Sequence, residues 1–139
     1  MSKRTWIDSD IWSDTEDLTD DEKIAYLYLL TNDQRNIAGY YKLNIRHMAF
    51  DLGVTESRLL KTLTREQKYW KYDIETSQVL IPKFTRYNIV KSKQQIAAMN
   101  AELTKLKVCP LHKVFLESWI EINGIGSEDL IDEKIKYFL

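Results

Sequence analysis

The sequence predicts a mainly α protein with a small β component, an α+β fold. Apolar side chains recur at helical spacing on both sides of Gly53, which indicates two short helices joined by a tight turn. An aromatic segment at residues 37–43 precedes them and has the composition of a β-strand. After Tyr69, two apolar stretches flank a polar turn, as in a hairpin. This order predicts a winged helix-turn-helix with a small hairpin wing, followed by C-terminal helices.

The composition is that of an ordered globular protein. The 139 residues are 44% hydrophobic and 29% charged and contain only 4 Gly and 2 Pro, which argues against disorder. No apolar run approaches the roughly 18 residues of a membrane-spanning helix, and the first residues lack the apolar core of a signal peptide. Cys109 is the single cysteine and has no partner for an internal disulfide. We therefore expect a cytoplasmic protein without a membrane partner.

The first long helix is predicted to begin after Thr19. Thr19 and Glu22 have the spacing of a capping box, and acidic residues in the first turn suit the positive end of the helix dipole. Apolar residues then continue to Leu30 in a broad pattern typical of a well-buried helix. Residues 1–17 are expected to be irregular, with Trp6 and its apolar neighbours docked onto the domain.

Capping residues mark both helices of the predicted helix-turn-helix. Asn44 can cap the first helix, and Gly53 can end it in the left-handed conformation. Thr55 can cap the second helix, which is predicted over residues 55–68 with its leucines facing the core. The hairpin strands then follow around the polar turn at residues 75–77.

Three further helices are predicted after the hairpin, opening at Ser92, at Pro110 and at Ser127. The last is expected to carry Leu130, Ile131, Ile135 and Phe138. The first has apolar residues at alternating spacings of three and four, which suits either a homodimer seam or packing onto its own domain. The four residues of this possible seam are Ile96, Met99, Leu103 and Leu106.

The elements divide the chain into two predicted domains. We predict a DNA-binding winged-helix domain at 1–90 and a helical extension at 91–139 for packing or oligomerisation.

Charge is distributed unevenly along the chain, although the net charge is only −1. Residues 1–33 carry 3 basic and 9 acidic side chains, and residues 116–139 carry 2 basic and 6 acidic ones. Residues 34–115 carry 15 basic and 6 acidic side chains, a local charge of +9. Because binding to a phosphate backbone depends on local positive charge, the middle segment is the expected nucleic-acid surface.

The second helix of the helix-turn-helix is the predicted recognition helix. Its basic side chains follow one stripe opposite the leucines, and arginine or lysine can donate to guanine O6 and N7 in the major groove. The exposed face of any surface helix could show the same stripe. The position of this stripe directly after the turn at Gly53 favours a role in DNA recognition. The predicted DNA-contacting residues are Arg58, Lys61, Thr62, Arg65 and Lys68 on the stripe, Thr55 and Ser57 at the helix start, Arg46 on the preceding helix, and Lys71 and Lys83 of the wing.

The sequence predicts no catalytic residues, no metal site and no cofactor. It lacks a glycine-rich loop followed by Lys-Ser or Lys-Thr, which would cradle the phosphates of ATP. Cys109, His112 and His47 lack the number and spacing of zinc ligands. The aspartates near the N-terminus lack the spacing of a calcium loop. An enzyme is therefore not expected.

Three stretches carry a family resemblance. They are Trp-Ile-Asp-Ser-Asp-Ile-Trp at residues 6–12, Tyr-Leu-Tyr-Leu-Leu-Thr-Asn at 26–32 and Ile-Ala-Gly-Tyr-Tyr-Lys-Leu at 37–43. Over about its first 90 residues the chain resembles the N-terminal winged-helix domain of phage replisome organisers. These are DnaD-like replication initiators of phages and prophages of low-GC Gram-positive bacteria. The chain departs from their pattern at Asn88-Ile89, where Asn-Pro is usual.

The resemblance implies that the protein binds double-stranded DNA at a phage replication origin, in the cytoplasm of the bacterial host. It also implies self-association and recruitment of a replication helicase or helicase loader. Two alternatives remain open. A winged-helix transcriptional regulator would use the same contacts on a promoter, and a protein-interaction module that has lost DNA binding would suit the acidic ends of the chain.

Overall fold

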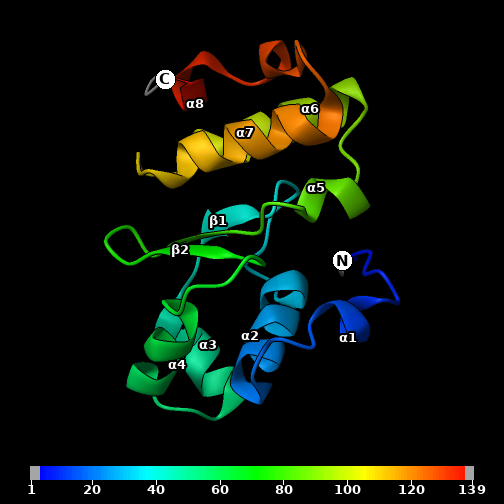
Figure 1. Ribbon diagram of the computed structural model, residues 1–139. Coiled ribbons are helices and arrows are strands. Elements are labelled where there is room, and N and C mark those ends of the chain that lie inside the picture. Colours follow the sequence, from blue (N-terminus) through cyan, green and yellow to red (C-terminus); the bar gives the residue numbers. More distant parts are fainter. Residues whose placement is uncertain (1–3, 137–139) are drawn as a thin grey trace.

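The computed structural model describes residues 4–136 and shows helices on both faces of a small sheet (Figure 1). The mainly α, α+β fold class is confirmed. The elements in chain order are α1 (Ile11–Asp14), α2 (Asp20–Thr31), β1 (Tyr40–Lys42), α3 (Ile45–Leu52), α4 (Glu56–Leu63), β2 (Lys71–Asp73), β3 (Gln78–Leu80), α5 (Phe84–Tyr87), α6 (Lys93–Leu103), α7 (Leu111–Asn123), the 3-10 helix η1 (Ser127–Leu130) and α8 (Glu133–Lys136).

The capping residues predicted for α2, α3 and α4 begin or end these helices. Ser127, which was also predicted to cap a helix, lies in the first turn of η1 and forms no side-chain cap. The Thr19 hydroxyl accepts a hydrogen bond from the Glu22 N–H at 3.2 Å, and the Glu22 carboxylate accepts one from the Thr19 N–H at 2.9 Å. Asn44 caps α3, and Thr55 caps α4. Gly53 ends α3 with φ +68°, in the left-handed region. The two helices of the predicted helix-turn-helix are therefore confirmed.

The three strands form one antiparallel sheet in the order β1-β3-β2. Val79 in the central strand pairs with Tyr41 on one side and with Tyr72 on the other. The first strand is shorter than the predicted 37–43 because the Asn36 side chain folds the preceding residues into a turn. Its oxygen accepts from the Ala38 N–H at 3.0 Å, and its nitrogen donates to the Tyr40 carbonyl at 2.6 Å.

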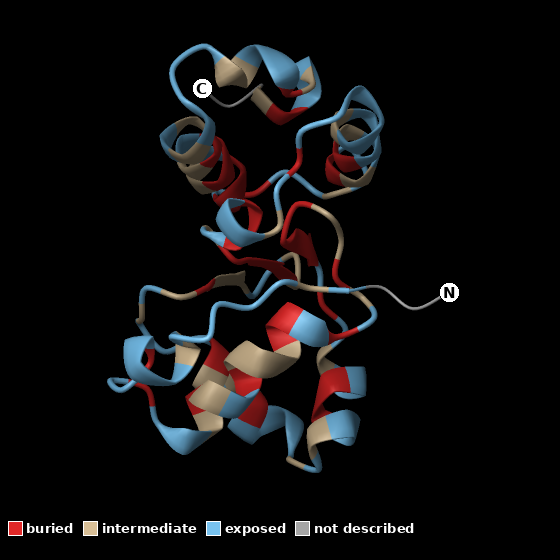
Figure 2. Ribbon diagram, turned by 90° about the vertical axis from the view of Figure 1, so that its right-hand side faces the viewer, coloured by how far each residue is buried: buried red, intermediate tan, exposed pale blue. Residues whose placement is uncertain are grey.

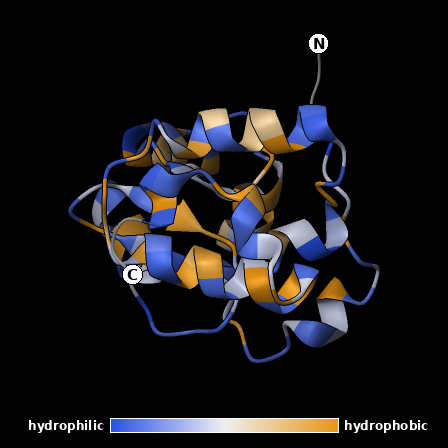
Figure 3. Ribbon diagram, turned by 90° about the horizontal axis from the view of Figure 1, so that it is seen from above, coloured by the Kyte–Doolittle hydropathy of each residue, from blue (hydrophilic) through white to orange (hydrophobic). Residues whose placement is uncertain are grey.

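Both faces of the sheet are covered, and each face has its own apolar core. One face contributes Tyr41 and Val79 to a core with leucines of α2, α3 and α4 and with Met48 of α3. The opposite face contributes Tyr40 and Leu80 to a core with α6 and α7. Figure 2 shows the buried residues, in red, on the helix faces that turn toward the sheet. Seen from above, hydrophilic and hydrophobic residues alternate along the helices, as expected for amphipathic elements (Figure 3).

The C-terminal extension is part of this three-layer arrangement. Met99 and Leu103 are fully buried in the core above the sheet, and Ile96 and Leu106 are partly buried against it. Of the two arrangements that their spacing left open, the structure shows these four residues packed onto their own domain. A seam through Met99 and Leu103 would require α6 to leave the sheet.

A buried polar cluster also joins the sheet to α7. The Tyr40 hydroxyl lies 2.6 Å from Nδ1 of His112 and 3.2 Å from the thiol of Cys109. Burial lowers the pKa of His112 below its ordinary value, which favours the neutral imidazole. The cluster thus gives the two layers a specific hydrogen-bonded contact in addition to apolar packing.

Three further expectations are corrected. Residues 1–17 are not wholly irregular, because α1 forms there, and of the apolar side chains expected to dock, Ile11 packs against the core while Trp6 and Trp12 are exposed. A short helix, α5, follows Pro82 where only the end of the hairpin was expected. The last predicted helix is divided into η1 and α8, with Ile131 and Ile135 buried, and Phe138 lies outside the described residues. None of the helices in residues 4–136 combines the length and apolar character needed to cross a membrane.

Candidate nucleic-acid interface

Helix α4 is anchored to the core along one side and exposed along the other. Leu59 and Leu63 are buried against α2 and α3. Ser57, Lys61 and Thr64 are exposed, at helical spacings of four and three. Within the part of the chain that the structure describes, the Lys61 ammonium forms no ion pair. Lys61 is therefore available to an anionic partner.

The start of α4 is held by Thr55. Its hydroxyl accepts a hydrogen bond from the Arg58 N–H at 3.2 Å and lies 3.3 Å from the Ser57 hydroxyl. Thr55 thus serves the helix cap, while Ser57 remains exposed beside it. Both hydroxyl groups lie at the helix end where backbone N–H groups favour anions.

Arg58 is turned toward α2. Its guanidinium forms two hydrogen bonds to the Asp21 carboxylate, at 2.7 and 2.9 Å. The side chains are 58% and 41% exposed, respectively. The hydrogen bonds from Arg58 hold the pKa of Asp21 below its usual value, so the carboxylate is charged at neutral pH. Arg58 therefore has to exchange a carboxylate for DNA before it can contact a base.

Arg65 is paired with the same turn of α2. Its guanidinium donates to the Glu22 carboxylate at 2.9 Å, and the Glu22 side chain is only 3% exposed. Because Glu22 also closes the capping box at Thr19, this pair joins the end of α4 to the start of α2. The structure thus gives Arg65 a part in fixing the orientation of α4.

The predicted basic stripe is therefore divided, and the predicted helix is too long. α4 ends at Leu63, so Arg65 and Lys68 lie in the irregular segment before β2. Thr62 is half-buried, and its hydroxyl donates to the Arg58 carbonyl at 3.1 Å. Of the five stripe residues, Arg58, Thr62 and Arg65 lie on the side of α2, and Lys61 lies on the exposed side.

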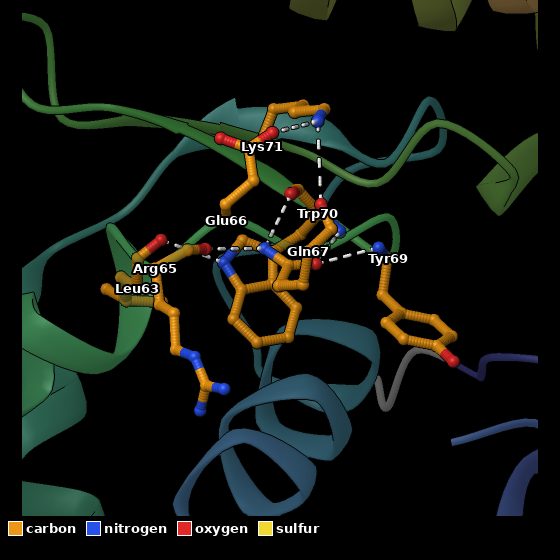
Figure 4. Close-up of polar contacts among 7 residues, drawn as sticks. All are labelled: Leu63, Arg65, Glu66, Gln67, Tyr69, Trp70 and Lys71. Atoms are coloured by element: carbon orange, nitrogen blue, oxygen red, sulfur yellow. Dashed lines mark hydrogen bonds and ion pairs between the residues drawn. The ribbon is translucent and has the colours of Figure 1, made fainter. Parts of the chain in front are cut away.

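The segment after α4 is folded by Gln67, as Figure 4 shows. The Gln67 carboxamide oxygen accepts from the N–H groups of Tyr69 and Trp70 at 2.7 and 2.9 Å, and its nitrogen donates to the Trp70 carbonyl at 2.8 Å. The buried Trp70 indole donates to the Leu63 carbonyl at the end of α4. These bonds end the helix and fix the start of the hairpin relative to it.

The two wing lysines lie at their predicted places in the chain, but their surroundings differ. Lys71 lies on β2, and its ammonium turns back to the Gln67 carbonyl at 3.4 Å and to Glu66 at 3.8 Å. Lys83 follows the hairpin and precedes α5. With Lys68 it lines a hollow of about 290 Å³ that is bordered by Trp6 and the N-terminal segment. Lys68 and Lys83 therefore belong to this hollow and not to the hairpin turn.

Helix α3 presents Arg46 and His47 on its exposed side. The His47 imidazole lies 3.3 Å from the Asp51 carboxylate, which also accepts a hydrogen bond from the Tyr28 hydroxyl at 2.7 Å. Among residues 4–136, Arg46 forms no ion pair. Arg46 thus remains available to a phosphate, as Lys61 does.

Sequence reasoning missed the partners of the two arginines. Asp21 and Glu22 were recognised as residues of a helix start and not as ion-pair partners of α4. The sequence does contain a signal for these ion pairs: the start of α2 is acidic, whereas the segment around Arg58 has an excess of basic residues. In residues 4–136 no three His, Cys, Asp or Glu side chains gather closely enough to hold a metal ion.

Comparisons with known proteins add no assignment to this geometry. No family model matches the chain, and no match was found among curated proteins or solved structures. The resemblance to phage replication initiators therefore remains a prediction from the residues quoted above.

Proposed function

We propose that the protein binds double-stranded DNA, with α4 in the major groove. The observation that carries the proposal is the division of α4 into a buried leucine side and an exposed side with Ser57, Lys61 and Thr64. The turn at Gly53 holds α3 behind it, and the hairpin follows it in the chain, which is the order used by winged-helix proteins. Lysine and small hydroxyl side chains suit base edges and phosphates in a groove.

The resemblance of the first 90 residues supports a phage replication origin as the DNA target. It likewise supports self-association and a replication helicase or helicase loader as partner. Selection of bound duplexes from random DNA and from phage genomic DNA would test the target. Enrichment of an origin sequence would support the replication role, and enrichment of promoter sequences would favour a transcriptional regulator.

One structural observation favours the alternative of a protein-interaction module. Arg58 and Arg65 are already paired with acidic residues of the same chain, which reduces the positive charge available on α4. A salt titration separates the two functions. A DNA-binding protein loses affinity steeply as salt rises, whereas a log–log slope near zero would mean that no phosphates are contacted.

Replacement of Lys61 by alanine is expected to weaken binding to the selected duplex by about 1–3 kcal/mol, because it removes an exposed donor from the last turn of α4. Fluorescence anisotropy at fixed salt measures the effect. Lys134→Ala is the control, since Lys134 is exposed on α8 in the other helical layer. Equal affinities of the Lys61 variant and the wild type would contradict the placement of α4 in the groove.

Replacement of Asp21 by asparagine is expected to strengthen DNA binding about threefold to tenfold. The change removes the carboxylate that holds the Arg58 guanidinium and so makes this cation available to DNA. Affinity should be compared with that of Asp20→Asn, which makes the same charge change in the same helix turn, away from the Arg58 pair. Equal effects of the two substitutions would mean that the Asp21–Arg58 pair does not compete with DNA.

A further inference from the structure

A buried glutamine ties the connection between α6 and α7 to the turn end of the hairpin. Gln78 opens β3 and is 1% exposed. Its carboxamide oxygen accepts a hydrogen bond from the Lys107 N–H at 2.7 Å, and its nitrogen donates to the Lys107 carbonyl at 2.8 Å. Both main-chain polar groups of Lys107 are therefore bonded to one side chain. This contact fixes residues 104–110, here called the connector, against the sheet.

The point of attachment is the end of the sheet next to the hairpin turn. Gln78 is in register with Lys42 of β1 and with Asp73 of β2. In Figure 1 the connector, coloured yellow, lies on the same side of the molecule as the hairpin turn and α4. The connector, the turn and α4 thus border one side of the protein.

The hairpin turn itself is poorly suited to a phosphate. Residues 74–77 contain an exposed acid, Glu75, and no basic residue. The Asp73 carboxylate is occupied within the turn, where it accepts a hydrogen bond from the Thr76 N–H at 2.9 Å. Positive charge beside the turn therefore has to come from elements other than the turn itself, and one such charge is the exposed Lys42 of β1.

The connector supplies such charge. Lys105 and Lys107 are both exposed. Lys105 is 3.4 Å from Glu102, but the two side chains are 70% and 45% exposed, so this ion pair is weak and easily exchanged. For Lys107, no ion pair is found in residues 4–136. The Lys107 main chain is already ordered by Gln78, which lowers the entropy lost when its side chain binds.

We propose that the connector is a phosphate-binding extension of the DNA interface, in which Lys105 and Lys107 contact the DNA backbone beside the hairpin turn. This inference rests on the DNA binding proposed above. In this arrangement α4 contacts the groove, and the C-terminal layer adds positive charge where the hairpin lacks it. The C-terminal layer thus contributes to affinity as well as to the core.

The test is a double substitution, Lys105→Gln with Lys107→Gln, in the full chain. Both positions are exposed, so folding should be preserved, and the unfolding midpoint checks this. Binding to one duplex is measured as a function of salt. Because each phosphate contact contributes about 0.9 to the log–log slope, loss of two contacts should lower the slope by about 1.8.

The matched control is Lys91→Gln with Lys93→Gln, which removes two charges at the opposite end of α6. Its slope should equal that of the wild type. If the wild type binds duplex DNA and the Lys105/Lys107 variant has the same slope, the proposed role of the connector is overturned, while the proposed DNA binding stands. A wild type that does not bind duplex DNA would overturn the proposed function and this inference together.

Discussion

Replacement of Gly39 by alanine is expected to destabilise the protein by about 3–5 kcal/mol, because two penalties add at this position. Gly39 has φ +69°, a conformation that strains any residue with a Cβ atom. An added Cβ would also lie 2.3 Å from both Cβ and Cγ of Phe84, whose side chain is buried in the core that the sheet forms with α2, α3 and α4. Neither atom is the free end of a flexible side chain, so the backbone has to move.

Chemical denaturation measures this loss, and Gly53→Ala is the matched control. Gly53 has nearly the same φ, +68°, but an added Cβ there would meet no atom within 4 Å. The control should therefore show only the conformational penalty, about 1 kcal/mol. Equal losses in the two variants would mean that the contact with Phe84 is not tight.

Replacement of Leu103 by alanine is expected to cost about 2–5 kcal/mol of unfolding free energy. Leu103 is fully buried in the core that α6 and α7 form with the sheet, and the truncated side chain would leave a cavity there. Leu130→Ala is the control, because Leu130 is 47% exposed and its truncation should have little effect.

The same experiment distinguishes a core residue from a dimer-seam residue. If Leu103 packs within its own chain, its truncation to alanine should leave any dependence of the unfolding midpoint on protein concentration unchanged. A dimer seam at Leu103 would make the wild-type midpoint rise with concentration, because association stabilises the folded state by mass action. A concentration-dependent midpoint that the variant abolishes would therefore contradict the packing described for α6.

Local features of the fold could be predicted because their causes are local in sequence. Thr19, Asn44 and Thr55 accept hydrogen bonds from residues three positions later, and Gly53 needs no partner beyond its own turn. The end of α4 was missed because it depends on side chains that come later in the chain. The Trp70 indole donates to the Leu63 carbonyl, and Gln67 folds the segment between them, neither of which has a strong sequence signal.

The candidate site was harder to predict because its electrostatics depend on distant pairs. Arg58 is 37 positions from Asp21, and Arg65 is 43 positions from Glu22. Periodicity placed both arginines opposite the leucines, but it could not show that α2 lies beside them. The choice between a dimer seam and packing onto the same chain was open for the apolar residues of α6 for the same reason. An apolar pattern of two heptads does not show which surface covers those residues.

The central strand has a consequence for how this chain can be divided. The strand β3 contributes to both cores, because Val79 is buried in one of them and Leu80 in the other. A fragment cut at residue 90, where the sequence suggests a boundary, would leave Tyr40 and Leu80 without the helices that cover them. The sheet would then present an apolar face to solvent, and apolar surface of this kind promotes aggregation. The two halves thus share one sheet, and we expect a fragment that ends at residue 90 to be less soluble than the 139-residue chain.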